Sequence, residues 1–543
     1  MKPWLTWKVC VAHCFVFAIR LGNVIQQPSS SSTDVATASA PKFVQGMGLF
    51  SATAIVMGSM IGSGIFIVPA DMSRVLGSPA LLIAAWLVTA LMTIIGALSY
   101  GELAAMMPKA GGQYVYLRES LGPIWGFLYG WTLFLVIQTG TIAAVGVAFG
   151  KFLGVFFPSV SATHWLWHVG SGNIGLSTAN LAAIVIIVLL TWTNTRGVRL
   201  GAAVQNVFTS AKVLALLAII AVGLLLLLEH RDTEGVAANF GHHFWTLALT
   251  KYQGFASTVN HSGPMLRAGI PEIVLNVAIA LAIVQVGSLF SSDAWNNVTF
   301  TAGEITNPKR NLPLSLAIGT GGVLLLYIAC NFVYLSVLPM MSQPTTYTFH
   351  PESLLQLGIA NAKQDRVATA VMEVAFGGLG AKLMAAAILV STFGCVNGML
   401  LAGARVYYAM SQDGLFFKSV GKLDEKTKTP VNSLWMQCGW ACLLCLSGQY
   451  GNLLDYVIFA VLVFYVLTIF GLFVLRRTRP DVARPYKAFG YPVLPALYIV
   501  MAVWICGVLL RYKPQYTWPG LILVLLGVPV YLVWKRQGTV ASD

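Results

Sequence analysis

Two glycines interrupt an apolar stretch that is otherwise typical of a membrane-spanning helix. Gly62-Ser63-Gly64-Ile65-Phe66 lies within the apolar residues 47–69. Each glycine costs a helix about 1 kcal/mol relative to Ala. A break at membrane depth is tolerated only where protein encloses the freed backbone or a ligand binds it. We therefore expect a binding site here, because backbone without side chains lets N–H groups approach a ligand closely.

A second interruption lies in the segment 287–297, which places Gly287, several polar residues and Asp293 at the expected bilayer centre. This segment belongs to the sixth predicted span and the glycine break to the first, so the two breaks begin successive sets of five spans. Because five is an odd number of crossings, the second set would be inverted in the membrane relative to the first. Interrupted helices at matching positions of inverted halves indicate a transporter site. Unwound N–H groups favour an anion and half-helix carbonyls a cation, and a zwitterionic α-amino acid supplies both.

The composition agrees with a membrane protein that must position these two breaks. Of 543 residues, 57% are hydrophobic and 10% charged, whereas about a quarter of a soluble domain is charged. The apolar blocks are long enough for a hydrocarbon core that takes about 20 helical residues to cross. We predict an all-α polytopic protein with twelve spans, at about 48–69, 79–106, 121–157, 178–194, 200–228, 271–303, 313–339, 380–411, 431–448, 453–475, 492–510 and 517–534.

The net charge of +14 is explained by topology. With both termini inside, most of the 33 Lys and Arg residues fall on the cytoplasmic side, which is the positive-inside pattern. This orientation predicts a multi-pass protein of the cell membrane, with the bilayer as its partner and no nucleic acid.

Neither a metal nor a cofactor is indicated. No Cys pair stands beside a His cluster, and Cys438, Cys442 and Cys445 share one helical face, where small packing residues are expected. Residues 1–44 begin with Lys2, Lys8 and an apolar run and could pass for a secretory signal. A disordered N-terminal tail is the preferred interpretation, and residues 536–543 form a C-terminal tail.

Four further motifs accompany the first break and together resemble one family. The chain is similar to the amino acid–polyamine–organocation superfamily and, within it, to the L-type amino acid transporters. The likeness covers roughly residues 45–535. The motifs that carry it are Gly62–Phe66, Pro108–Gly112, Glu304–Pro313, Phe393–Gly398 and Arg479–Lys487.

The resemblance implies a LeuT-like fold, which is a 5+5 inverted repeat with broken helices one and six plus two C-terminal helices. Residues 45–535 would form the permease domain, with repeat one at about 48–228, repeat two at about 271–475 and the extra helices at about 492–534.

The resemblance also implies a substrate site at the two breaks. The substrate carboxylate would bind the backbone N–H groups of Ser63 and Gly64, and the ammonium would meet carbonyls near Met60 and Phe290. Phe290 holds the position of an aromatic gate, against the alternative of core packing. The full expected set is Met60, Gly62, Ser63, Gly64, Phe290, Ser291 and Asp293. For the glycines, the alternative is close helix packing through small residues.

Lys212 is a lone charge near the cytoplasmic end of the fifth span. It could snorkel to the interface. The resemblance instead implies that its ammonium stands where sodium-coupled relatives bind a cation, bridging the first half of span one and polar groups of span eight near Ser391. This assignment argues against sodium coupling.

Asp293 departs from the Gly of well-known animal members, and three roles stay open. It could couple protons, favour a substrate with an extra positive charge, or hydrogen-bond the unwound backbone of span six. Val461 and Leu462 replace a polar Asn-Trp pair in span ten, so pocket preferences do not transfer. The loop 158–177 lacks the Cys that family members use for a disulfide to a single-span glycoprotein, so we expect no disulfide-linked heavy chain.

Glu102 and Arg405 lie at cytoplasmic span ends, where either gating salt bridges or simple interfacial anchors occur. The sequence as a whole predicts a secondary amino acid transporter that is not an enzyme. It would exchange neutral L-amino acids without sodium by alternating access. Alternatives are a proton-coupled amino acid symporter, a polyamine or other amine transporter, and a non-transporting amino acid sensor.

Overall fold

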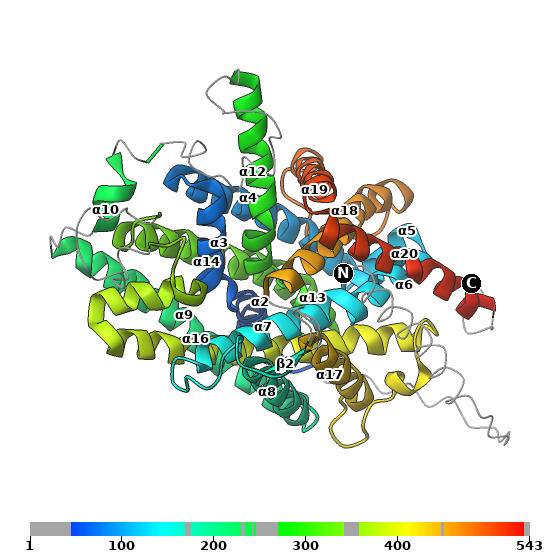
Figure 1. The fold of residues 1–543 in the computed structure, drawn as a ribbon. Coiled ribbons are helices and arrows are strands. Elements are labelled where there is room, and N and C mark those ends of the chain that lie inside the picture. Colours follow the sequence, from blue (N-terminus) through cyan, green and yellow to red (C-terminus); the bar gives the residue numbers. More distant parts are fainter. Residues whose placement is uncertain are drawn as a thin grey trace.

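Nearly all of the described chain is helical (Figure 1). The computed structural model describes residues 45–168, 175–229, 234–241, 244–245, 270–341, 358–446 and 450–536. The predicted N-terminal tail 1–44 and residues 537–543 of the C-terminal tail lie outside these ranges. The proposed domain and repeat boundaries stay predictions.

The helices follow the predicted spans in order. In the first half they are α2 (Leu49–Met60), α3 (Gly64–Leu76), α4 (Pro79–Met106), α5 (Gln113–Leu121), α6 (Pro123–Thr132), the π-helical turn η1 (Leu133–Ile137), α7 (Gln138–Leu153), α8 (Thr178–Asn194), α9 (Val198–Leu228) and α10 (Glu234–Asn239). A two-stranded antiparallel sheet, β1 (Trp165–His168) and β2 (Gly175–Ser177), precedes α8 and pairs Trp165 with Ser177.

In the second half the helices are α12 (Ile270–Ser291), α13 (Asn297–Phe300), η5 (Ala302–Glu304), α14 (Pro308–Val337), η6 (Lys363–Asp365), α16 (Val367–Gln412), η7 (Lys418–Gly421), α17 (Val431–Cys445), α18 (Tyr450–Thr478), α19 (Val493–Tyr512) and α20 (Pro514–Arg536). α16 turns at Phe376–Gly377, where Gly377 has φ +61°, a value that suits a residue without Cβ. The predicted span 380–411 is therefore the part of α16 after this turn.

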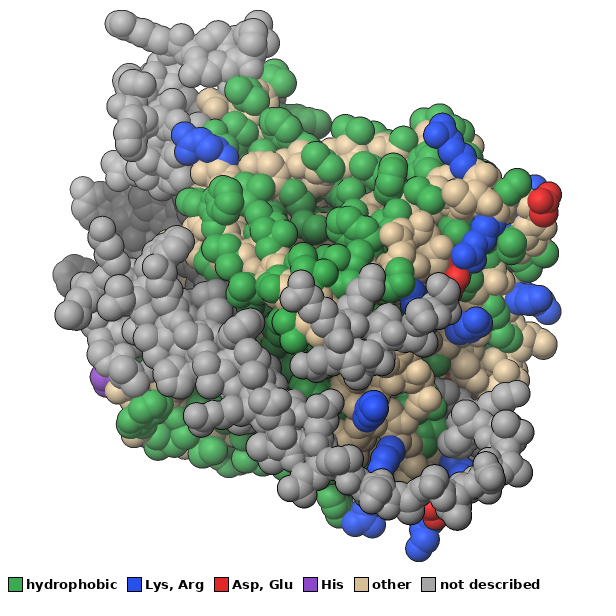
Figure 2. Space-filling model, turned by 90° about the vertical axis from the view of Figure 1, so that its right-hand side faces the viewer, with side chains coloured by type: hydrophobic (Ala, Val, Ile, Leu, Met, Phe, Trp, Pro, Cys, Tyr) green, Lys and Arg blue, Asp and Glu red, His purple; other side chains and the backbone are tan. Residues whose placement is uncertain are grey.

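Ten helical segments of the described chain are long and apolar enough to cross a membrane. α8, with 17 residues, and α17, with 15, are shorter. The structure confirms a helical polytopic protein, whereas the count of twelve spans and the inverted repeat stay predictions. Exposed apolar side chains such as Val207, Leu214 and Leu228 on α9 suit contact with lipid. On the face in Figure 2, apolar side chains cover the middle while most visible Lys and Arg lie toward the right and lower edges.

The first span is broken where the glycines predict. α2 ends at Met60 and α3 begins at Gly64, near the centre of the view in Figure 1. The expectation that the second half ends near Pro69 is wrong, because α3 continues to Leu76. Proline removes only the hydrogen bond of its own nitrogen, and the rest of α3 keeps its helical bonds on both sides.

The sixth span is also broken, between α12 and the short α13. Residues 292–296 join the two helices, and Ala294 adopts φ +64°, which is rare for a residue with a Cβ. The chain then tightens into η5 before α14 begins at Pro308. α12 packs against α3 and α4, and α14 packs along both α2 and α4, so the two broken spans share one neighbourhood.

Three backbone hydrogen bonds tie the start of the first span to the end of the sixth, one of them from the Gly46 N–H to the Glu304 carbonyl at 3.0 Å. The Met47 N–H donates to the Glu304 carbonyl at 3.1 Å, and the Thr306 N–H donates to the Met47 carbonyl at 2.9 Å. The Glu304 side chain in turn pairs with Arg405 of α16, whose Nε lies 3.1 Å from its Oε1. Both side chains are almost fully buried. Spans one, six and eight therefore meet at one buried ion pair.

Glu102, the other residue considered for gating, is buried at the end of α4. Its carboxylate accepts hydrogen bonds from Arg476 at 2.6 and 2.9 Å and from the Ala488 N–H at 2.7 Å. The Arg484 Nε lies 3.3 Å from the same group. Glu102 thus holds the segment between α18 and α19 against α4, and a gating role for Glu102 or Arg405 stays a hypothesis.

We predict that Arg405→Met lowers the melting temperature of the purified protein far more than Lys422→Met, which removes an exposed charge. The loss follows because Glu304 would be left as an uncompensated buried charge, at a cost of about 3–5 kcal/mol. Thermal unfolding in detergent measures the difference. The double variant Glu304→Gln/Arg405→Met should recover part of the loss. Equal melting temperatures for the two single variants would contradict the prediction.

Candidate functional site

The break in the first span sets two helix ends against each other. Residues 61–63 carry the chain from the carbonyl end of α2 to the amide end of α3, which starts at Gly64. A helix end of the first kind attracts cations, and one of the second kind attracts anions. The Gly62 N–H donates to the Met60 carbonyl at 2.8 Å, which closes the turn. Both charges of a zwitterion therefore find complementary helix ends within a few residues.

The two breaks touch each other, and glycine allows the contact. A Cβ on Gly64 would overlap with the side chain and Cα of Ser291, the last residue of α12. A Cβ on Gly62 would lie 3.2 Å from the Sγ of Cys395 on α16, a distance tighter than ordinary packing. The structure thus brings Gly62, Gly64 and Ser291 together, as the sequence analysis expected, and no larger residue fits at Gly64 without displacing its neighbours.

Tyr327 of α14 bridges the two breaks, and the sequence analysis missed it. Its hydroxyl lies 3.0 Å from the Met60 carbonyl and 3.1 Å from the Ser291 carbonyl. One hydroxyl proton serves only one acceptor fully at a time. Tyr327 therefore occupies the carbonyl groups near which a substrate ammonium was expected. A tyrosine within an apolar span carries no sequence signal for this role.

Lys212 and Ser391 bind the other side of the first break. The buried Lys212 ammonium donates to the Gly58 carbonyl at 2.5 Å, so the snorkelling alternative is wrong. The Ser391 hydroxyl lies 3.1 Å from the Ile61 carbonyl and 3.2 Å from that of Gly62. The polar contacts expected from spans five and eight therefore converge on the end of α2. An ammonium bonded to a helix-end carbonyl fills a place that suits a cation.

Phe290 lies in α12 at the edge of the second break, and Asp293 lies within the break. Phe290 is buried in the last turn of α12, and its carbonyl accepts the Asp293 N–H at 3.3 Å. The Asp293 side chain turns away from the first break and accepts a hydrogen bond of 2.6 Å from the Tyr465 hydroxyl of α18. Asp293 is thus not brought to the glycine break. Its direction could not be read from the sequence, because an unwound segment has no helical period.

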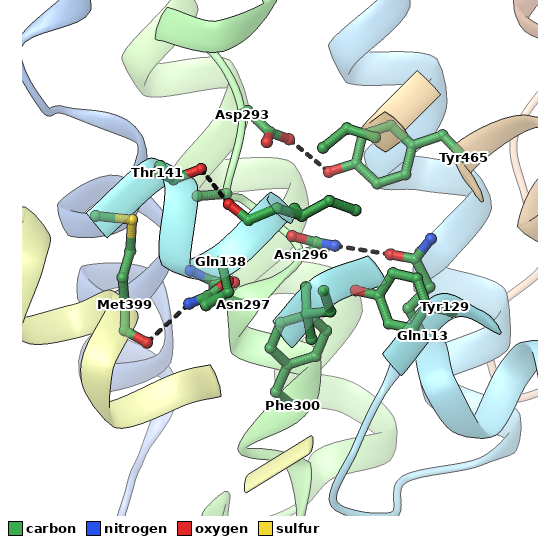
Figure 3. Close-up of a pocket in the computed structure, with 14 residues that line it drawn as sticks. Gln113, Tyr129, Gln138, Thr141, Asp293, Asn296, Asn297, Phe300, Met399 and Tyr465 are labelled. Atoms are coloured by element: carbon green, nitrogen blue, oxygen red, sulfur yellow. Dashed lines mark hydrogen bonds between the residues drawn. The ribbon is translucent and has the colours of Figure 1, made fainter. Parts of the chain in front are cut away.

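A small cavity adjoins the second break (Figure 3). Asp293 lines this cavity, but the other expected site residues do not. Asn296 donates to Gln113 at 2.9 Å, and Gln138 donates to the Met399 carbonyl at 2.7 Å. The polar composition of 287–297 could have pointed to Asn296, whereas Gln113 and Gln138 had no such signal. No group of three or more His, Cys, Asp or Glu within the described residues is placed to hold a metal ion.

Comparison with known proteins identifies the family. Residues 47–531 match the family model described as amino acid permease. The chain is 29% identical to Large neutral amino acids transporter small subunit 2 of Homo sapiens over 514 residues, which cover 92% of this chain and 82% of that protein. It is also 29% identical to Asc-type amino acid transporter 1 of Mus musculus over 502 residues, 90% of this chain and 82% of the relative. The b(0,+)-type amino acid transporter 1 of Mus musculus is 29% identical over 501 residues, 92% and 89% of the two chains.

These relatives are named as transporters rather than enzymes. The words "small subunit" in the name of the human relative describe one chain of a larger assembly, so the expectation that this chain has no heavy-chain partner gains no support from the comparison. The family model spans almost all of the described residues. The protein belongs to the amino acid permease family, within the amino acid–polyamine–organocation superfamily and on its L-type branch.

Proposed function

We propose that this protein exchanges neutral L-amino acids across a membrane by alternating access and without sodium. The observation that carries the proposal is the contact between two broken spans at membrane depth. Gly64 opens α3 beside Ser291, while Met60 closes α2. Amide and carbonyl helix ends then face one small space, which complements the carboxylate and ammonium of an α-amino acid.

In this proposal the carboxylate binds the N–H groups of Ser63 and Gly64, and the ammonium binds the carbonyl side near Met60 and Phe290. Tyr327 holds the two breaks together by donating to their carbonyls. When substrate binds, its ammonium replaces the Tyr327 hydroxyl as donor to one of these carbonyls. Phe290 forms the aromatic side of the site. These particular residues would bind the substrate because the partial charges of a helix lie on the free N–H and C=O groups of its terminal turns.

Sodium independence is supported by Lys212. Its ammonium already donates to the Gly58 carbonyl at the end of α2, with Ser391 on the adjoining carbonyls. A bound cation placed there would be repelled by the ammonium. The protein's own charge therefore takes the place of a coupling ion.

For topology, we propose twelve spans in two inverted sets of five plus α19 and α20, counting the shorter α8 and α17 as spans. Both termini would be cytoplasmic in the cell membrane, since this orientation puts most basic residues inside. Any second subunit would be held without a disulfide from loop 158–177, which contains no Cys. The proposed activity involves no covalent step, so the protein is not an enzyme in this account.

Exchange predicts that uptake into proteoliposomes depends on the internal amino acid. Radiolabelled L-leucine should enter vesicles preloaded with unlabelled L-leucine and should hardly enter empty ones. Replacing sodium by choline should leave the rate unchanged, since Lys212 fills the place of the ion. Equal uptake by empty vesicles driven by a pH gradient would favour symport instead. A polyamine that is taken up while neutral amino acids are not would favour an amine transporter, and binding without uptake would favour a sensor.

Gly64→Ala should reduce L-leucine exchange by about tenfold or more, because overpacking against Ser291 costs about 1–3 kcal/mol. The control is Gly321→Ala on α14, where an added Cβ meets nothing within 4 Å. Initial exchange rates, normalised to the amount of reconstituted protein, measure the effect. If both variants exchange at the wild-type rate, the substrate does not bind at the glycine break.

Lys212→Met should also slow exchange, by roughly tenfold to a hundredfold, because a hydrogen bond to a charged group contributes about 1.5–3 kcal/mol. The Gly58 carbonyl would lose its buried donor. The matched control is Lys382→Met, which removes an exposed lysine of α16. The same normalised rates serve as readout. A wild-type rate in the Lys212 variant would show that this ammonium has no part in transport.

A further inference from the structure

Asp293 lies where two cavities meet. The first is the cavity of Figure 3, in which Asp293 and Tyr465 are at one end and Phe300 is at the other. Its polar lining consists of amides and hydroxyls, the amides from Gln113, Gln138, Asn296 and Asn297 and the hydroxyls from Tyr129, Thr141 and Tyr465. Such groups hold ordered water readily, since a buried water needs two to four polar partners. This polar lining therefore suits an ordered water beside the Asp293 carboxyl.

The second cavity is also small and lies between α4, α12, α18 and α19. It shares only Asp293, Val461 and Tyr465 with the first, so the hydrogen bond between Asp293 and Tyr465 forms part of the wall between them. The Ser292 hydroxyl, 1% exposed, lines this cavity and has no hydrogen-bond partner in the described structure. A buried hydroxyl without a partner favours a bound water or another polar group beside Asp293.

The groups that face Asp293 offer no positive charge. The titratable ones are tyrosines, namely Tyr465 of α18, Tyr129 in the first cavity, Tyr498 in the second, and Tyr100 of α4, whose ring centroid is 5.6 Å from that of Tyr465. α5 and α16 contribute Gln113 and Met399. No Lys, Arg or His of the described chain lines either cavity, and none of its recorded ion pairs includes Asp293.

The nearby cations are engaged elsewhere. Lys212 bonds to Gly58 on the far side of the first break, and Arg405 pairs with Glu304. Burying a lone carboxylate costs several kcal/mol unless a cation or a proton neutralises it. The two neutral hydrogen bonds, from the Tyr465 hydroxyl and the Ala294 N–H, do not compensate for that cost.

We propose that Asp293 is a proton-binding site and that neutral amino acids move only while Asp293 is protonated. This inference rests on the proposed exchange function and adds the charge state of the carrier. Tyr465 donates to Oδ1, so the proton binds Oδ2, forming an O–H bond as a hydronium in a solvated cavity becomes water. During exchange the proton stays with the carrier in both directions. Homoexchange therefore moves no net protons, yet each unidirectional rate depends on pH.

The test measures exchange of radiolabelled L-leucine in preloaded proteoliposomes across a series of external pH values. Because the protonated form is the competent one, the rate should be maximal at acidic pH. Above the titration point it should fall by about tenfold for each pH unit. Asp293→Asn, which cannot ionise, should give a flat profile. The control Asp481→Asn removes an exposed carboxylate and should keep the wild-type profile.

Tyr465→Phe provides a second variant in case Asp293→Asn does not fold. It removes the hydrogen bond that stabilises the charged carboxylate, so its profile should move to higher pH. A flat wild-type profile would overturn the inference, as would a wild-type profile in Asp293→Asn. So would pH-independent exchange of L-lysine in place of L-leucine, since the side-chain cation would then neutralise Asp293. Loss of all exchange in wild type refutes the proposed function instead.

Discussion

The structure depends on how it satisfies backbone groups that unwinding frees inside a membrane. Where α2 gives way to α3, and α12 to α13, carbonyls lose their helical donors in a place without water. Side chains supply the missing bonds: Tyr327 serves Met60 and Ser291, Lys212 serves Gly58, and Ser391 serves Ile61 and Gly62. These donors come from spans seven, five and eight, so the break in span one is held by three other spans.

The same requirement connects the breaks to motion. Tyr327 shares one hydroxyl between two carbonyls from two spans, a weaker arrangement than separate donors. A substrate ammonium competes for these carbonyls and so changes how the two breaks are joined. Away from them, Arg405 and Glu304 join spans six and eight. In our account, ligand binding changes the connection that Tyr327 makes between the two breaks. The Arg405–Glu304 ion pair meanwhile resists movement of spans six and eight.

Asp293 shows that one unwound segment can face two environments. Ser291 lies against Gly64 of the glycine break, while Asp293, two residues later, bonds to α18 between two cavities. Recognition of the amino acid's backbone and control of the carrier's charge are therefore separated in space. The first cavity combines amide side chains with an apolar lining that includes Leu133, Ile137 and Phe300.

The sequence was sufficient for the two breaks and for most helix boundaries, because apolar runs, glycines and a mid-membrane acid are local signals. For Lys212 the residues alone left snorkelling open, and it was the resemblance to the L-type family that implied a cation position beside span one, where the ammonium donates to the Gly58 carbonyl. The sequence did not predict Tyr327 or Gln138, whose importance lies in which carbonyl they meet across the bundle. The extent of α3 beyond Pro69 was missed for a similar reason, because neighbouring helices support a turn that proline alone would weaken.

The account is tested most directly by an experimental structure with an L-amino acid bound. It predicts that the ligand carboxylate lies within hydrogen-bond distance of the N–H groups of Ser63 and Gly64, with its ammonium beside the Met60 carbonyl and Tyr327. A ligand bound wholly within the cavity lined by Gln113 and Phe300, with the glycine break unoccupied, would contradict it.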